Sequence, residues 1–138
     1  MTFLPDEQYN ELAFYTLAHP DPNFIHQHIV DAFTAQNADE QTKPIGMVFS
    51  LAGLYLYIEK GFTGRQVQQA HMKMAKHKNN LPSIQLPAER GNITISDVLM
   101  APAGGERDHM IYKWCEAVWS AFQNNRDVII SLTQSIIQ

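Results

Sequence analysis

The sequence of 138 residues has little cysteine, little charge and no familiar catalytic motif. Cys115 is the only cysteine, which excludes an internal disulfide and a multi-cysteine zinc site. Charged residues make up 17% of the chain, against about 25% in an average domain. The net charge of −4 argues against general binding to nucleic acid. P-loop, G-x-G-x-x-G, H-E-x-x-H and G-x-S-x-G patterns are all missing, so no motif assigns a reaction.

Signals for export and for membrane insertion are also missing. The longest apolar stretch, residues 45–58, has the length of a buried helix and is too short to span a bilayer. Residues 1–7 lack the basic start and apolar segment of a secretory signal, so we predict a reduced, cytoplasmic protein. The length and the 45% of apolar residues predict one folded domain over residues 1–138.

Helix-start signals recur along the chain and predict an all-α fold. Five places combine a capping residue with proline or with a partner three residues later: Asp6, Asp21–Pro22, Thr42–Pro44, Thr63 with Gln66, and Thr94 with Asp97. Residues 79–92 contain two prolines and little periodicity, which indicates a long, ordered, irregular crossover. We therefore expect a compact four- or five-helix bundle around the central apolar helix of residues 45–58.

Six histidines are the unusual feature of the composition. In the predicted second helix, His26 lies about 50° from the centre of the apolar face and His28 about 110° from it. Asp31 is expected to point toward solvent and Gln36 toward the core. His71 lies on the apolar face of the fourth helix. We predict that His26 and His71 are mostly buried, each with a ring nitrogen bound to a hydrogen-bond partner or a metal.

Three interpretations of these histidines stay open. The first is a structural hydrogen-bond network, and the second is a divalent metal such as zinc, bound by two or three of His26, His28 and His71 together with Glu59. The third is a small-molecule pocket lined by the same side chains. The sequence thus predicts a helical domain with a histidine-lined polar cavity, and it leaves open whether the protein is an enzyme. Cys115 is expected to be a buried apolar residue rather than a nucleophile.

Residues 60–78 contain five basic residues and no acidic one. Their pattern of helix, glycine-containing turn and helix is loosely that of a helix-turn-helix, with Arg65, Gln66 and Lys73 able to face a groove. The alternative function is therefore an interaction or regulatory module that faces nucleic acid. The overall acidity of the chain favours instead an ordinary solvated face.

The C-terminal part predicts self-association. Trp114 and Trp119 lie about 140° apart around their helix, so one packing partner would hardly cover both. We predict a homodimer with residues 114–137 in a two-fold interface. The alternative is that the crossover covers this surface and the protein is a monomer.

Four segments carry a resemblance to a known family: Phe24–Gln36, Gly53–Leu56, Ile93–Val98 and Cys115–Trp119. The chain resembles, over roughly residues 19–123, an uncharacterised bacterial family of small helical proteins, a domain of unknown function. The resemblance implies a bacterial, soluble and mainly helical domain, and it implies no activity and no set of site residues.

Overall fold

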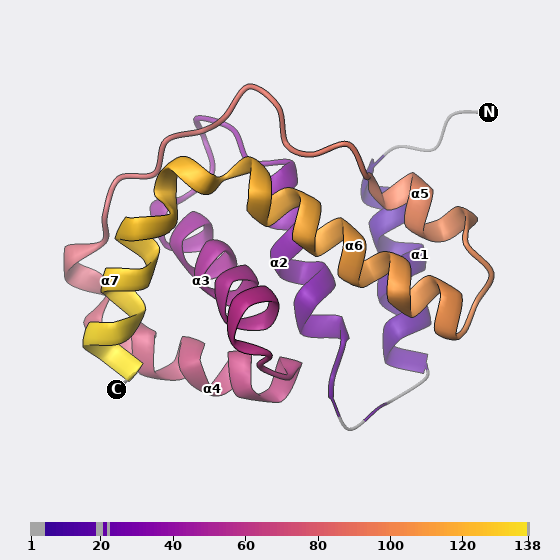
Figure 1. Ribbon diagram of the computed structural model, residues 1–138, viewed down its shortest axis with the longest axis horizontal. Coiled ribbons are helices and arrows are strands. Elements are labelled where there is room, and N and C mark those ends of the chain that lie inside the picture. The colour runs from indigo at the N-terminus through magenta and orange to yellow at the C-terminus, as the bar shows by residue number, and fades with distance from the viewer. Residues whose placement is uncertain (1–4, 19–20, 22, 138) are drawn as a thin grey trace.

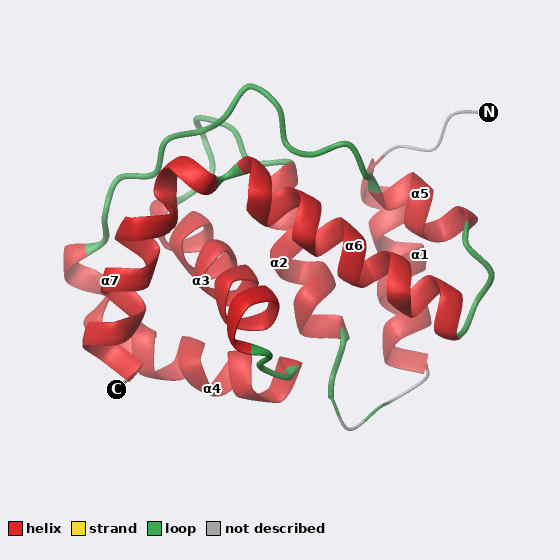
Figure 2. Ribbon diagram, viewed as in Figure 1, coloured by secondary structure: helices red, strands yellow, loops and turns green. Residues whose placement is uncertain are grey.

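The computed structural model describes residues 5–18, 21 and 23–137 (Figure 1). Over these residues the chain forms helices and no strand, which confirms the all-α class (Figure 2). The α-helices are α1 (Pro5–Ala18), α2 (His26–Gln36), α3 (Pro44–Lys60), α4 (Gly64–Met74), α5 (Ile95–Met100), α6 (Gly105–Ala121) and α7 (Arg126–Ile137). Two 3-10 helices, η1 (Ala75–Asn80) and η2 (Gln123–Asn125), follow α4 and α6. The count exceeds four or five because the short α5 and the separate α7 are elements of their own.

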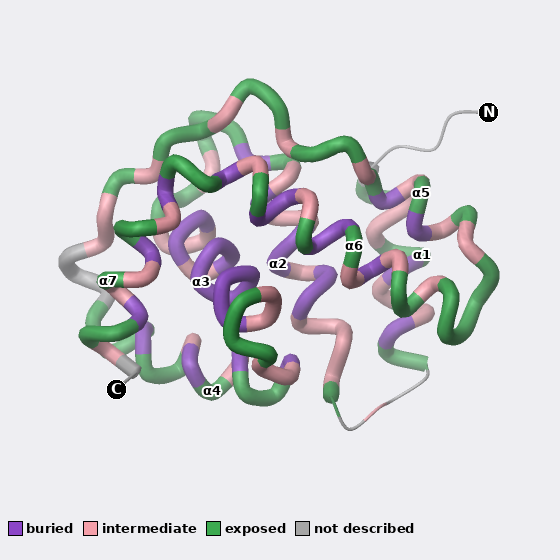
Figure 3. Tube along the Cα trace, in the orientation of Figure 1, coloured by how far each residue is buried: buried purple, intermediate pink, exposed green. Residues whose placement is uncertain are grey.

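The predicted central helix is α3. It packs against α2, α4, α6 and α7, and residues 51–56 are buried without interruption (Figure 3). A helix that is apolar nearly all round is stable only when it is covered on most sides, as α3 is here. Pro44 occupies its first turn, and Gly61 ends it in a left-handed conformation with φ of 70°.

Two predicted capping boxes are confirmed and one helix start is shifted. Thr63 with Gln66 begins α4, and Thr94 with Asp97 begins α5. In contrast, α2 begins at His26 rather than near Pro22, which itself lies outside the described residues. The Asp21 carboxylate accepts the backbone N–H of Asn23 at 2.9 Å and thereby closes a turn ahead of the helix.

The crossover is confirmed as a long irregular segment, although residues 79–80 belong to η1. Residues 81–94 run along the length of the molecule from the end of η1 to α5 (Figure 1). Gly91 allows it to lie close to α6, because a Cβ there would approach the Ala117 carbonyl oxygen to 3.0 Å. Gly91 also has a φ of 97°, which other residues rarely adopt.

Both tryptophans of α6 are covered within a single chain. Trp114 is 0% exposed and Trp119 is 2% exposed. The two tryptophans therefore give no support to a two-fold interface at residues 114–137. Val128 remains 40% exposed, and the side chain of Ile137 lies outside the described part. The homodimer stays a prediction.

Candidate functional site

The deeply buried histidine of α2 is His28, not His26. His28 is 2% exposed, and its ring stacks on Tyr57 with centroids 3.5 Å apart and an angle of 6° between the planes. His26 is partly buried at the first residue of the helix, where its Nδ1 lies 2.9 Å from Thr16 Oγ1. The ranking by apolar face is wrong because α2 packs against α1, α3, α4 and α6. A residue at the boundary of the apolar face therefore still faces protein.

His71 is partly buried and has the predicted ring-nitrogen bond. Its Nε2–H donates to the Phe49 carbonyl at 2.8 Å, and the two rings stack with centroids 5.1 Å apart. Burial lowers the pKa of His71 and of His26, and it lowers the pKa of His28 to about 4. His28 is therefore neutral at physiological pH, and charging it in acid opposes folding.

Asp31 is buried, whereas the helix pattern places it toward solvent. It is 2% exposed, and its Oδ1 accepts a hydrogen bond from Gln27 Nε2 at 3.2 Å. Its Oδ2 occupies the space that Gly53 leaves open, because an added Cβ at Gly53 would lie 2.0 Å from that oxygen. Burial raises the pKa of Asp31 well above its usual range, which favours the neutral carboxylic acid.

These residues form one buried polar cluster between α2, α3 and α6. His28 and Asp31 face Tyr57 and Gly53 on α3, and the Cys115 thiol of α6 donates to the His28 carbonyl at 3.6 Å. Burial raises the pKa of Cys115, which keeps it a thiol, as expected of a core residue. His28 Nδ1 and Asp31 Oδ2 are buried, and neither has a hydrogen-bond partner among the residues that the structure describes. The cluster is therefore not the fully satisfied network of the first interpretation.

The four predicted metal ligands have four different surroundings. His26 contacts Thr16, His28 stacks on Tyr57 and His71 binds the Phe49 carbonyl. At the end of α3, Glu59 accepts hydrogen bonds from the side chains of Trp119, at 2.7 Å, and Arg126, at 2.8 Å. Among the described residues, no group of three or more histidine, cysteine or acidic side chains is placed to hold a metal ion. The predicted zinc-type set gains no support from this geometry.

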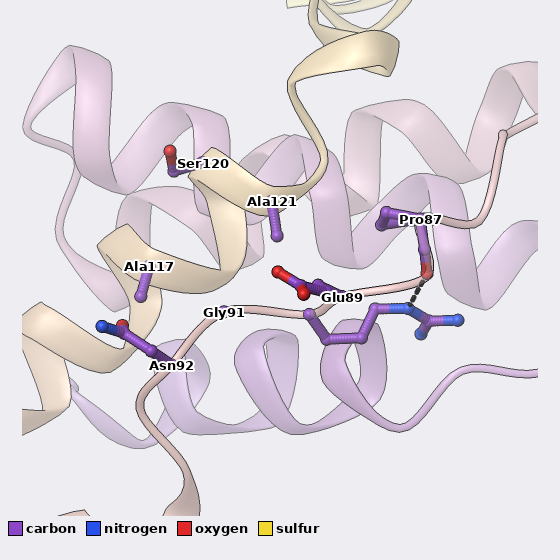
Figure 4. A pocket seen from close by; sticks show the side chains of 8 residues that line it. Pro87, Glu89, Gly91, Asn92, Ala117, Ser120 and Ala121 are labelled. Atoms are coloured by element: carbon purple, nitrogen blue, oxygen red, sulfur yellow. Dashed lines mark hydrogen bonds between the residues drawn. The ribbon is translucent and has the colours of Figure 1, made fainter.

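A second candidate is the crossover groove, an open depression of ≈ 870 Å³ between the crossover and α6 (Figure 4). Its lining residues are Pro87, Glu89, Arg90, Gly91, Asn92, Ala117, Ser120 and Ala121. On the α6 side of the groove, Ala117 and Ala121 contribute only small apolar side chains. The Glu89 carboxylate stands between the crossover and Ala121 in Figure 4.

Arg90 fixes the crossover to the C-terminus of α2. Its Nη1 donates to the carbonyls of Ala35 at 3.1 Å and Ala38 at 2.9 Å, and its Nε donates to Pro87 at 2.7 Å. The Arg90 guanidinium also lies over the Phe122 ring, 5.5 Å from its centroid, which is within the distance of a cation–π contact. A cation at this end of a helix is favoured by the helix dipole. No pattern in the sequence pointed to this role.

Gln36 and Asn125 hold the crossover at two further points. Gln36 faces the interior as predicted, donating from Nε2 to the Ile93 carbonyl at 2.7 Å and accepting from Trp114 Nε1 at 2.8 Å. The Asn125 side chain pairs with the backbone of Gln85, accepting its N–H at 2.7 Å and donating to its carbonyl at 2.9 Å. The wall of the groove is therefore built on specific hydrogen bonds.

The free polar groups of the groove favour a cation. The side chains of Glu89, Asn92 and Ser120 make no hydrogen bond or ion pair with any part of the chain that the structure describes. Arg90 is committed to the crossover and to α2. Ser120 and Ala121 lie in the last turn of α6, where the helix dipole adds partial negative charge.

The basic segment 60–78 is only partly available for readout of bases. The Gln66 side chain accepts the Thr63 N–H in the capping box at 2.8 Å, and the Arg65 guanidinium lies 4.6 Å from the centroid of Phe24. Lys73 and Lys76 are exposed, while the side chain of Lys78 is outside the described residues.

Comparisons with known proteins identify a family and nothing closer. The model of a family of unknown function (DUF5946) matches residues 6–123. Searches of curated proteins and of solved structures found no match. Within the described residues, no helix is long and apolar enough to cross a membrane.

Proposed function

We propose, for a chain that belongs to the DUF5946 family of unknown function, a role as a binding domain that takes a small organic cation in the crossover groove. The observation that carries this proposal is the Glu89 carboxylate, which faces the groove without a partner among the described residues. Asn92 and Ser120 add oxygen atoms that accept hydrogen bonds from an ammonium or guanidinium group.

The groove suits an organic cation better than a metal ion. Calcium takes six to eight oxygen ligands, and magnesium demands near-octahedral oxygen geometry. The groove offers one carboxylate. An amine needs only two or three acceptors, and its carbon chain can contact the alanines on the α6 side of the groove. The sequence predicts a small ligand in a histidine-lined cavity, whereas we propose that the ligand binds in the crossover groove. A cytoplasmic location and a bacterial source stay predictions.

The test is a titration of the isotope-labelled protein with putrescine, followed by the NMR shifts of its backbone amides. We expect saturable shifts confined to residues 87–92 and 117–121. Affinity for so small a ligand is limited, so half-saturation is expected at millimolar concentration. Glu89→Gln keeps the shape, removes the charge and is expected to weaken binding about tenfold, since a charge-assisted hydrogen bond contributes about 1.5 kcal/mol or more.

Glu106→Gln is the matched control, because Glu106 is an exposed glutamate at the other end of α6. It should bind putrescine as the wild type does. Absence of saturable shifts, or equal binding by Glu89→Gln, would refute the proposal. A parallel titration with Zn²⁺ that saturates and shifts the histidine resonances would restore the metal interpretation instead.

A further inference from the structure

The outer face of α1 is acidic at one end and apolar at the other. Glu7, Glu11 and Phe14 follow one another at spacings of four and three residues, which places them on one stripe of the helix. Phe14 is 75% exposed and Leu17, on the following turn, is 54% exposed. Large apolar side chains side by side on a surface are typical of an interaction site.

The outer face of α4 and η1 has the opposite charge. Gln69, Met72, Lys73 and Lys76 are all exposed, and Met72 is 69% exposed. They lie at helical spacing over the α4–η1 segment. Each of the two outer faces therefore combines charged residues with an exposed apolar side chain. The charged residues are acidic on α1 and basic on α4 and η1.

Charge is divided unevenly along the chain. Residues 60–78 hold five of the ten basic residues and none of the fourteen acidic ones, so five basic and fourteen acidic residues remain for the rest. In α1 the charged residues are Asp6, Glu7 and Glu11, all acidic. This division concentrates basic side chains in residues 60–78 and leaves the rest of the chain with a net negative charge.

The acidic face of α1 and the basic face of α4 and η1 form no ion pairs with each other within one molecule, as far as the structure describes it. Figure 1 shows α1 and α4 at different ends of the fold, with α2 between them. The side chains of Glu7, Glu11, Lys73 and Lys76 take part in no hydrogen bond or ion pair with another described residue. Both charged faces are thus open to a partner.

We propose that the α1 face docks on the α4 face of a second copy of this chain. In an antiparallel arrangement, Glu7 and Glu11 approach Lys76 and Lys73, and Phe14 reaches the neighbourhood of Met72. Acidic side chains at the start of one helix then meet basic side chains at the end of the other, and the two helix dipoles oppose each other favourably. A thioether against an aromatic ring is a favourable contact.

A second copy fits better than nucleic acid. Glu7–Phe14 on α1 and Gln69–Lys76 on α4 and η1 each cover about 10 Å at 1.5 Å per residue, so the two stripes match in length. Met72 lies in the middle of the basic face, and a phosphate backbone offers it no apolar partner. The excess of acidic residues on the remaining chain also repels a polyanion.

The test uses two charge-reversed variants of the full chain and measures their mass in solution by sedimentation. One variant carries Glu7→Lys with Glu11→Lys, and the other carries Lys73→Glu with Lys76→Glu. We expect the wild type to form dimers or larger species as its concentration rises, and to dissociate as salt screens the charges. Each variant alone presents two faces of like charge and should associate at least about tenfold more weakly, because like charges across an interface suppress binding.

An equal mixture of the two variants should associate again, because the reversed α1 face of one meets the reversed α4 face of the other, and the two native faces also meet, each pair with opposite charge. Glu40→Lys with Glu116→Lys is the control, since both residues are exposed and lie outside the two faces. It should associate as the wild type does. Circular dichroism of each variant shows whether it is folded before its mass is interpreted.

A monomer at every concentration overturns the proposal, and so does association that survives both reversals. The proposal is also overturned if the folded mixture fails to associate. Binding of a short DNA or RNA duplex that is lost in Lys73→Glu with Lys76→Glu, without any self-association of the wild type, would assign the basic face to nucleic acid.

Discussion

The two ends of α2 differ in how far their polar groups are hydrogen-bonded. In its first half, His28 and Asp31 are enclosed, and within the described part of the chain each keeps one atom without a hydrogen-bond partner. Near its end, Gln36 and the carbonyls that Arg90 contacts are joined in a continuous set of hydrogen bonds. The first arrangement depends on groups that stay neutral and on space left by a glycine. The second depends on hydrogen bonds from the Arg90 guanidinium, so the two ends should respond differently to mutation and to pH.

Among the variants that test this difference, Gly53→Ala is expected to lower the free energy of unfolding most. The new Cβ would lie 2.0 Å from Asp31 Oδ2, and the carboxyl group is enclosed by protein. Overpacking together with displacement of a buried polar group should cost about 3 to 4 kcal/mol of unfolding free energy, measured by urea denaturation.

Two further variants decide whether the clash is the cause. In Gly53→Ala combined with Asp31→Ala, the oxygen is gone and most of the loss should be recovered. Gly46→Ala is the matched control on the same helix, because nothing lies within 4 Å of a Cβ there. It should be neutral or stabilise by about 0.5 to 1 kcal/mol. Equal losses for Gly46→Ala and Gly53→Ala would contradict the role assigned to the Gly53 space.

The pH dependence of His28 is expected to be the next largest effect. Its pKa is lowered from 6.5 to about 4 in the folded state, so the folded protein binds fewer protons in this range than the unfolded chain. Its contribution to stability is complete above pH 6.5 and is lost as pH falls toward 4. At about 1.36 kcal/mol per unit, the loss is about 3 kcal/mol. His28→Phe keeps the stacking on Tyr57 and should remove this loss.

Asp31 should act in the opposite direction. Its pKa is raised in the folded state, so its contribution is complete below the unfolded value of 3.8 and is lost as pH rises through the folded value. Urea denaturation from pH 4 to 7 separates the two groups. Relative to the wild type, Asp31→Asn should lose stability more steeply in acid, and His28→Phe should lose less. Identical pH profiles for all three proteins would argue against buried, neutral forms of these two side chains.

Arg90→Ala tests the other end of α2 and is expected to have the smallest effect of the three. Removing the guanidinium leaves the carbonyls of Ala35 and Ala38 without their donor, which should cost about 2 kcal/mol. Hydrogen exchange should show faster opening of the crossover. Arg90→Lys keeps the charge but not the planar guanidinium, so its stability should lie between those of the wild type and Arg90→Ala. A crossover that stays equally protected in Arg90→Ala would show that Gln36 and Asn125 suffice to hold it.

Helix starts and the central helix could be predicted because their signals are local. A capping box such as Thr63 with Gln66 is complete within four residues, and the apolar run of α3 fits only the middle of a bundle. The burial of Asp31 could not be predicted, because it depends on Gly53, twenty-two positions away, in a neighbouring helix. A helical wheel assumes one buried face and one solvent-exposed face, whereas α2 is covered by other helices on several sides.

The candidate site was predicted less well for the same reason. The importance of the α2 histidines and of Gln36 could be read from their positions on the helix. Their assembly into one metal site could not, because spacing along the chain says nothing about which helices meet. Arg90 lies in a segment without periodicity, so its binding of the α2 carbonyls follows only from the path of the crossover.

The pairing of Asn125 with Gln85 also sets an order of events during synthesis. The side-chain amide of Asn125 pairs with both the N–H and the carbonyl of Gln85, as the backbone of a neighbouring strand would. Asn125 is synthesised forty residues after Gln85. Helices α1 to α4, by contrast, contact one another within the first part of the chain. On the ribosome the four N-terminal helices can therefore assemble early. The crossover lacks this pair of hydrogen bonds until α6 and η2 have emerged, so its path at Gln85 is fixed only after them.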